Sequence, residues 1–237
     1  MEEDVGDLIV NGSMLKKYLF VILFSVSFCF PVYKGFCSEN VPRSSLALDV
    51  VLKNIKENEA RLKIFTARIM QTRESSLLRK PLRSEGMIYF DHAGKILLQF
   101  TEPSRMLILV KNNTLIVYYP DLPKVMRRYM GGGFIRKYFG IGQSVAKLCN
   151  QYSIQLLDRE KSGGYHLKLV PRGSTIKRHI DSIEVRISPQ NWLPEEICME
   201  EHKGDRTVFH LKFLSINEPL PPGIFAISLP EDYDNFH

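Results

Sequence analysis

Apolar and polar residues alternate with a repeat of two over most of the chain, and this pattern constrains the fold most. In residues 65–70, phenylalanine, alanine and isoleucine alternate with threonine, arginine and methionine, and residues 182–187 and 209–213 repeat the pattern. Successive side chains of a β-strand point to opposite faces, so each stretch predicts a half-buried strand. Turn-forming sequences separate the stretches at short intervals, which favours antiparallel neighbours in a meander. The turns lie at 91–94, 111–113, 162–164 and 203–205.

Two segments depart from the alternation and predict helices. Ser44 and Ser45 can cap a helix that ends near Leu62, because Leu48, Val51, Leu52 and Ile55 follow helical spacing. Between Gly131 and Tyr152 the apolar spacing suits one or two short helices. The expected architecture is mainly β, with about eleven strands. Because exposed sheet edges are unfavourable, we expect these strands either to close into a barrel or to curve around a core or a bound molecule.

The N-terminus has the order of a secretory signal peptide. Lys16 and Lys17 precede an apolar run at 18–32, and Gly35, Cys37 and Ser38 then supply small residues. The run has 15 residues, whereas a membrane-spanning helix needs about 20. We therefore expect cleavage near Cys37 or Ser38, with a retained signal anchor as the alternative. Residues 1–13 precede Met14 as an upstream extension.

Residues 1–38 are thus assigned to the extension and signal peptide, and residues 39–237 to a single domain. Removing 1–38 leaves a formal charge of +7, from 29 basic and 22 acidic residues. The basic residues are spread along the strands without a Lys/Arg-rich run, which argues against nucleic-acid binding. Periplasmic localisation is the expectation.

The sequence contains no motif typical of a catalytic, metal or cofactor site. Residues 142–146 nearly match the G-x-S-x-G nucleophile elbow, but that motif needs a parallel sheet, which the strand pattern excludes. The three glycines at 131–133 lack the lysine of a phosphate loop, and the six histidines lack metal-ligand spacing. The chain is predicted not to be an enzyme, with no catalytic residue, metal or cofactor.

Two cysteines, Cys149 and Cys198, remain after residue 38. In an oxidising compartment they can form a disulfide. The alternative is two buried free thiols, because the sequence does not give the distance between them.

Four segments, taken in their order and with their spacing, resemble segments of the periplasmic outer-membrane lipoprotein carrier family, the LolA-like proteins. The segments are Phe65-x-Ala67-x-Ile69-x-Gln71, Ser84-x-Gly86 with the following 87–90, Thr101-Glu102-Pro103 with 114–120, and Phe225-x-Ile227-x-Leu229-Pro230 as a closing strand. The resemblance extends over about residues 44–233.

The resemblance implies an unclosed antiparallel half-barrel, covered by the N-terminal helix and a central helical lid. It implies a monomer that holds lipoprotein acyl chains, takes them from an inner-membrane ABC-type release complex and passes them to an outer-membrane acceptor. An alternative on the same half-barrel is a module that senses envelope lipids or lipoproteins.

Apolar strand positions either line a lipid cavity or pack a solid core, since both arrangements place apolar residues at alternate positions. The resemblance favours a cavity. We expect it to be lined by Phe65, Ala67, Ile69, Leu98, Phe100, Leu107, Leu109, Ile116, Tyr118, Phe209, Leu211 and Phe213.

One departure from the family pattern concerns the lid. At the turn where relatives usually carry arginine and proline, this chain has His92 and Ala93. The family's arginine is thought to hold the lid closed, so His92 is either a weaker latch or an ordinary turn residue. Imidazole offers fewer hydrogen-bond donors than guanidinium and titrates near neutral pH.

Overall fold

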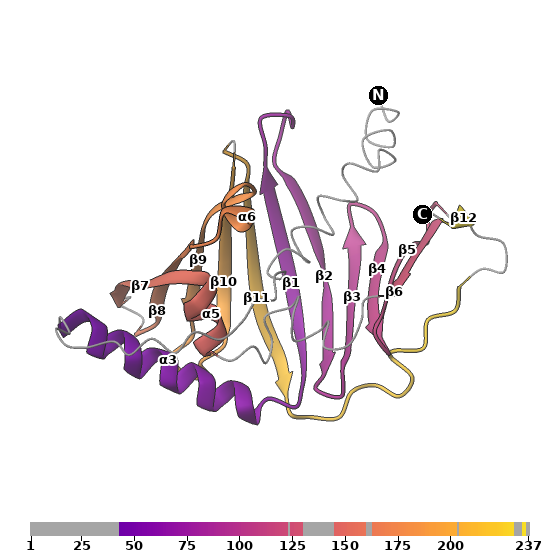
Figure 1. Ribbon diagram of the computed structural model, residues 1–237. Coiled ribbons are helices and arrows are strands. Elements are labelled where there is room, and N and C mark those ends of the chain that lie inside the picture. Colours follow the sequence, from indigo (N-terminus) through magenta and orange to yellow (C-terminus); the bar gives the residue numbers. More distant parts are fainter. Residues whose placement is uncertain are drawn as a thin grey trace.

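The computed structural model describes residues 43–122, 124–129, 145–159, 163–202, 204–229 and 234–235. They form one unclosed sheet of twelve strands in the order β12-β6-β5-β4-β3-β2-β1-β11-β10-β9-β8-β7 (Figure 1). All neighbouring strands are antiparallel except β12 and β6. The strands are β1 (Ile64–Glu74), β2 (Leu82–Asp91), β3 (Lys95–Glu102), β4 (Met106–Lys111), β5 (Thr114–Tyr119), β6 (Lys124–Tyr129), β7 (Tyr152–Arg159), β8 (Tyr165–Pro171), β9 (Ile180–Ile187), β10 (Pro194–Glu201), β11 (Arg206–Ile216) and β12 (Asp234–Asn235).

Helix α3 (Arg43–Arg61) precedes the sheet and lies across one end of it, beside β7 (Figure 1). Its bounds confirm the predicted N-terminal helix. Helix α5 (Val145–Gln151) leads into β7, and the short α6 (Ser174–Lys177) connects β8 with β9. The earlier part of the predicted lid, up to residue 144, lies outside the described residues.

Short turns explain why sequential strands lie side by side. Asn112 and Asn113 join β4 to β5 with φ angles of 51° and 59°, and asparagine adopts this left-handed region more readily than most residues. Gly94 turns β2 into β3 with a φ of 98°, and the Asp91 carboxylate accepts a hydrogen bond from the Ala93 N–H. The meander expected from these sequences is confirmed.

The predicted closing strand is wrong. Residues 226–229 have no strand conformation; instead β12 pairs with β6 in parallel. Figure 1 shows the segment after β11 running past the ends of β1–β4 toward β6. The Lys95 ammonium lies 5.7 Å from the centre of the Phe225 ring, so this segment contacts β3 through its side chains. The alternating segment 225–229 therefore contacts the sheet through Phe225 without extending it as a strand.

Candidate functional site

Strand register places most of the apolar residues on one face of the sheet, here called the inner face and defined by Phe65, Ala67 and Ile69 of β1. In β2 these residues oppose Phe90, Ile88 and Gly86, and cross-strand partners lie on the same face. Following the pairs from β11 to β5 gives further apolar members of this face, which are Ile96, Leu98, Phe100, Met106, Ile108, Val110, Leu115, Val117, Phe209, Leu211 and Phe213.

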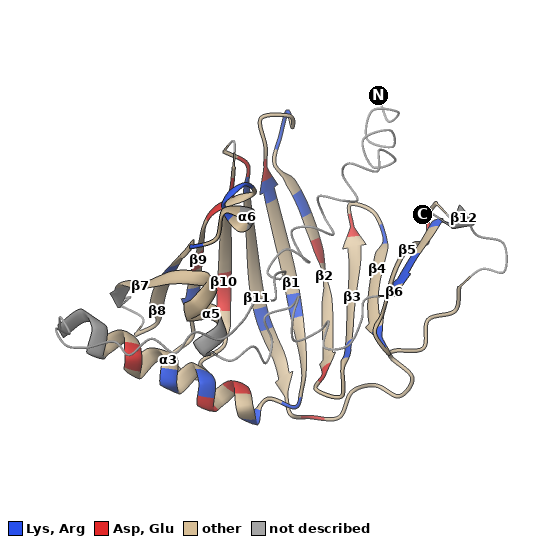
Figure 2. Cartoon of the chain, in the orientation of Figure 1, with Lys and Arg blue, Asp and Glu red and all other residues tan. Residues whose placement is uncertain are grey.

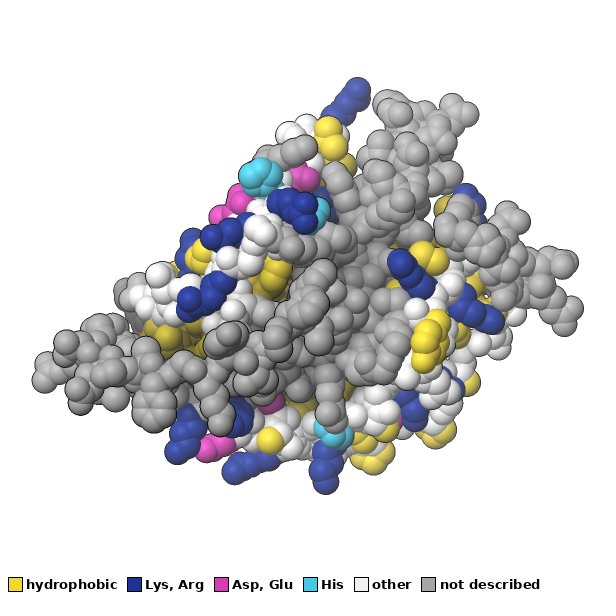
Figure 3. Space-filling view, viewed as in Figure 1, with side chains coloured by type: hydrophobic (Ala, Val, Ile, Leu, Met, Phe, Trp, Pro, Cys, Tyr) yellow, Lys and Arg dark blue, Asp and Glu magenta, His cyan; other side chains and the backbone are white. Residues whose placement is uncertain are grey.

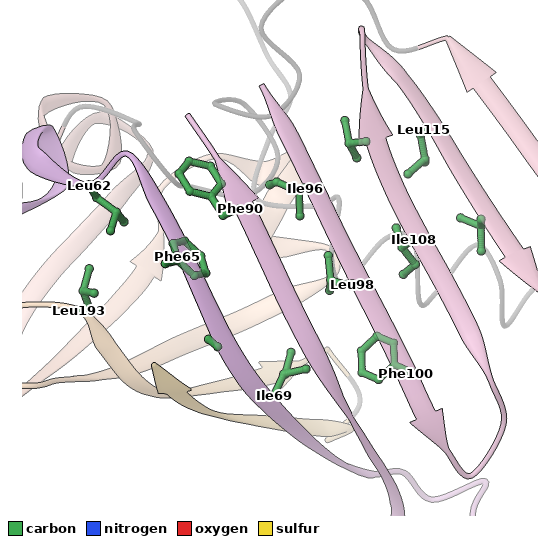
Figure 4. Packing of buried hydrophobic residues seen from close by; sticks show 13 residues of the cluster. Leu62, Phe65, Ile69, Phe90, Ile96, Leu98, Phe100, Ile108, Leu115 and Leu193 are labelled. Carbon is green, nitrogen blue, oxygen red and sulfur yellow. The ribbon is translucent and has the colours of Figure 1, made fainter. Parts of the chain in front are cut away.

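Aromatic packing organises the centre of this face. The rings of Phe65 and Phe90 are stacked with centroids 5.0 Å apart, and Phe213 meets Phe65 edge-on at 5.2 Å. Figure 4 shows these apolar side chains projecting from β1–β4 to the same side of the sheet. The apolar surface is therefore continuous from β11 across β1 to β5.

Gly86 interrupts the row of side chains on β2. A Cβ at this position would lie 2.9 Å from the Phe100 Cα and closer still to the carbonyl oxygen of Gln99. Ile69 and Phe100 flank it in register on the neighbouring strands. The absence of a side chain here lets β2 and β3 approach closely beside Phe100.

A second apolar cluster lies on the same face under α3. Val51 is 2% exposed and packs with Leu48 and Ile55 of the helix against β7–β10. Trp192 stacks on Tyr165 with ring centroids 4.9 Å apart. Phe209 packs against both clusters, so it connects the part covered by α3 with the part formed by β1–β5.

Helix α3 also carries a carboxyl group in its apolar stripe. Glu59 follows Val51 and Ile55 at four-residue intervals, so it lies on the helix face that packs toward the sheet. Burial raises the pKa of its carboxyl from 4.5 to about 7. Near neutral pH this group therefore exists in both charged and neutral forms.

Charged residues mark one end of the inner face. Arg73 is 3% exposed; its Nη2 lies 3.3 Å from Asp205 Oδ2 and 3.5 Å from Glu201 Oε2. Thr207 Oγ1 donates to Glu201 Oε1 at 3.3 Å. At this end of β1 the inner face therefore changes from apolar to paired, charged side chains.

The structure brings together eight of the twelve residues predicted to line a cavity: Phe65, Ala67, Ile69, Leu98, Phe100, Phe209, Leu211 and Phe213. The other four, Leu107, Leu109, Ile116 and Tyr118, lie on the opposite, outer face, because Leu109 opposes Leu97 and Ile116, and Leu107 opposes Tyr118. The prediction that they line the same surface as the other eight was wrong, because it chose the inward-facing positions of β4 and β5 one residue out of step. A shift of one residue along a strand moves each side chain to the other face.

Sequence reasoning missed the inner residues of β4 and β5, which are Met106, Ile108, Val110, Leu115 and Val117. Their strands are apolar at nearly every position, so alternation gives no signal there. The inner positions of β4 could be derived from Phe100 of β3 only if the pairing register across the turn at Pro103 were known, and the sequence does not give this register. Ile88 and Phe90 were detectable, since they continue the alternation of β2 from Gly86.

His92 lies in the exposed turn between β2 and β3. Its backbone N–H donates to the Lys63 carbonyl oxygen at 2.7 Å, which ties this turn to the start of β1. Its role as a lid latch stays a prediction, because most of the predicted lid lies outside the described residues.

Cys149 and Cys198 are both free in this structure. Cys198 lies on the outer face, opposite Val208 and Glu184, whereas α5, which carries Cys149, packs through Leu148 against the inner-face cluster under α3. The sheet separates the two thiols, so of the two alternatives the structure has the free thiols, with Cys198 buried and Cys149 half-buried. The Arg206 Nε lies 3.2 Å from the Cys198 sulfur, yet burial dominates and raises the pKa of this thiol.

Within the described ranges, no group of three or more His, Cys, Asp or Glu side chains is placed to hold a metal ion. The helices described there include none that is both long and apolar enough to cross a bilayer.

The sequence matches the family model "Outer membrane lipoprotein carrier protein LolA" over residues 60–228. No curated protein matches it. Among solved structures, an uncharacterised conserved protein from Thermus thermophilus superposes with a TM-score of 0.52 at 11% identity, covering 80% of this chain and 98% of that one.

Two further structures align less closely. A LolA superfamily protein from Nitrosomonas europaea gives a TM-score of 0.38 at 16% identity, covering 76% of this chain and 97% of that chain. A putative outer membrane lipoprotein-sorting protein domain from Vibrio parahaemolyticus gives 0.40 at 12% identity, covering 75% and 97%. The family match spans well over half of the chain and includes the inner-face strands, so this chain belongs to the LolA family of outer membrane lipoprotein carrier proteins.

Proposed function

We propose that this protein is a periplasmic carrier that binds lipoprotein acyl chains on the inner face of its half-barrel and transfers them from the inner to the outer membrane. One observation carries the proposal: the inner face from β11 across β1 to β5 forms one continuous, buried apolar cluster, which ends at the Arg73 cluster. The apolar run at 18–32 and the small residues after it support export.

The physical problem is to keep acyl chains out of water. Each methylene exposed to water costs about 0.8 kcal/mol, so a long acyl chain costs on the order of 10 kcal/mol. An apolar surface that offers no fixed polar contact offsets this cost without favouring one chain length. Release then needs only a competing apolar environment, such as an acceptor or a bilayer.

No bond is made or broken in this function, and we accordingly propose a carrier without catalytic activity. The partners proposed are the acyl chains of lipoproteins, an inner-membrane ABC-type release complex and an outer-membrane acceptor, with the carrier acting as a monomer.

A release assay tests carriage. Protein isolated from periplasmic extract is incubated with inner-membrane vesicles that hold a radiolabelled lipoprotein and the release complex. We expect a soluble one-to-one complex of carrier and lipoprotein, measured by gel filtration. Lipoprotein that stays with the vesicles, or absence of the protein from the periplasmic extract, would contradict the proposal.

Site-specific photo-crosslinking tests the binding face. Met106 and Leu107 are adjacent in β4 and both half-buried, but Met106 lies on the inner face and Leu107 on the outer face. A photoreactive amino acid at position 106 should capture the labelled acyl chain, and the same group at 107 should not. Equal capture at both positions would place the cargo elsewhere.

A further inference from the structure

The hairpin that joins β1 to β2 carries a fully projecting apolar side chain. Leu77 is 77% exposed, which is the largest value among the exposed large apolar residues in the described part of the chain. Its N–H donates to Ser75 Oγ at 3.3 Å, and the Leu78 N–H donates to the Ser75 carbonyl oxygen at 3.0 Å. These bonds form a tight turn that holds Leu77 away from the protein. Figure 1 shows the hairpin extending beyond the ends of the neighbouring strands.

The same hairpin is strongly basic. Arg79, Lys80 and Arg83 are exposed, and residues 75–84 contain no acidic residue. Among the described residues, no carboxylate lies within ion-pair distance of these three cations. The preceding Glu74 is directed toward Arg206, 4.0 Å away. Figure 3 shows basic and apolar side chains together at the projecting tip of the molecule, and Figure 2 shows the basic positions on the hairpin.

A single exposed leucine is ordinary on a protein surface. An exposed leucine at the end of a projecting turn, surrounded by unpaired cations, has the chemistry of a membrane interface. The apolar side chain gains by leaving water for the acyl boundary, and each cation near an anionic surface contributes about fivefold to the partition constant.

We propose that the β1–β2 tip, defined as residues 75–83, docks on the surface of a bilayer that contains anionic lipids. Leu77 enters the interface, and Arg79, Lys80 and Arg83 contact the headgroup phosphates. This inference goes beyond the carrier function and does not depend on it, because the tip lies outside the inner-face cluster and its cations are exposed.

The chain offers a local probe, because Trp192 is its single tryptophan and is half-buried against Tyr165. Leu77→Trp in the full chain adds a second tryptophan at the tip, and Tyr129→Trp is the matched control at a residue 73% exposed on β6. Each variant is mixed with vesicles of brominated phosphatidylcholine, with or without about one third phosphatidylglycerol, and the wild-type signal is subtracted. Quenching by the brominated acyl chains reports insertion of that one position, so association of the apolar residues 18–32 with the vesicles does not confuse the result.

We expect quenching and a blue shift at position 77 on anionic vesicles only, with little change at position 129. Adding Arg79→Gln and Lys80→Gln in the Leu77→Trp background should shift the equilibrium between inserted and free tip roughly 30-fold toward the free form. Equal quenching on neutral and anionic vesicles, or quenching at 77 no greater than at 129, would overturn the proposal. Loss of vesicle docking with normal cargo crosslinking at position 106 would separate the tip from the carrier function.

Discussion

Glu59 is a carboxyl group at a position where α3 otherwise presents apolar residues to the sheet. Desolvation raises its pKa from 4.5 to about 7, so the folded protein binds this proton more tightly than the unfolded chain does. The sign follows from linkage: the carboxylate destabilises the fold above pH 7, and this cost disappears as the pH falls from about 7 toward 4.5.

We therefore predict that Glu59→Gln stabilises the protein at pH 8 by at most about 3 kcal/mol and has little effect near pH 4.5. Urea unfolding at several pH values measures the difference. Glu57→Gln is the matched control on the same helix. The Glu57 side chain is half-exposed, and its Oε1 lies 3.9 Å from the exposed Lys53 Nζ, so this substitution removes a helix carboxylate that is not buried. A gain at pH 8 that is equal for both variants would show that helix charge, and not burial of Glu59, is responsible.

Gly86 gives a second prediction at the scale of one residue. Gly86→Ala places a Cβ 2.9 Å from the Phe100 Cα and against the Gln99 carbonyl oxygen, and backbone atoms cannot move aside easily. We expect a loss of about 2–4 kcal/mol in the free energy of unfolding. Gly173→Ala is the control, because its φ is −85° and no atom lies within 4 Å of the added Cβ. Comparable losses in the two variants would mean that close approach of β2 and β3 is not the cause.

The junction of α3 and β1 depends on the residue that follows β11. Asn217 Oδ1 accepts from the N–H groups of Lys63 and Ile64 at 2.8 and 3.3 Å, and its Nδ2 donates to the Arg61 carbonyl oxygen at 3.0 Å. Its φ is 59°. One side chain thus connects the end of the helix with the start of the first strand and the end of the last long strand.

Asn217→Ala should destabilise the protein by about 2–3 kcal/mol, from lost hydrogen bonds and from alanine in a left-handed conformation. Asn217→Gly relieves the backbone but not the hydrogen bonds, so it should lose less, about 1–2 kcal/mol. Chemical denaturation measures both. If glycine restored full stability, the side-chain bonds to the α3–β1 junction would contribute nothing.

Predictability from sequence differed among the strands for a physical reason. β1 alternates clearly because its outer residues Arg68 and Met70 are exposed, and its inner face was predicted correctly. β4 and β5 are at least partly covered on both sides, because on the outer face Leu109 is 3% exposed and Leu107, Ile116 and Tyr118 are half-buried. A strand buried on both faces reads as a continuous apolar run, so its orientation follows only from register with its neighbours.

The remaining errors have the same origin. The segment around Phe225 alternates like a strand but adds no strand to the sheet there, and its contact with Lys95 of β3 is a tertiary contact that local pattern does not contain. The choice between a disulfide and two free thiols, which the sequence left open, likewise depends on which side of the sheet Cys149 and Cys198 occupy. Helix α3 and the turns were predicted from local signals alone.

At the scale of the whole molecule, Phe209 connects the apolar cluster under α3 with the cluster on β1–β5. Phe209→Ala should cost about 3 kcal/mol in stability, because it opens space between two clusters that share this ring. Val208→Ala, on the outer face of the same strand, should cost about 1 kcal/mol or less. Thermal unfolding followed by circular dichroism measures both, and equal costs would show that the clusters do not depend on this connection.

The unclosed sheet has a consequence for the range of cargo. In a closed barrel, strand number and stagger fix the circumference, so the interior has one size. Here β7 and β12 end the described sheet without pairing to each other. Small changes in twist between neighbouring strands can then spread or tighten the curve while every ladder hydrogen bond is kept. Under the proposed carrier function, the capacity of the inner face is thus an elastic property of the sheet, and we expect one sequence to hold acyl chains of unequal length.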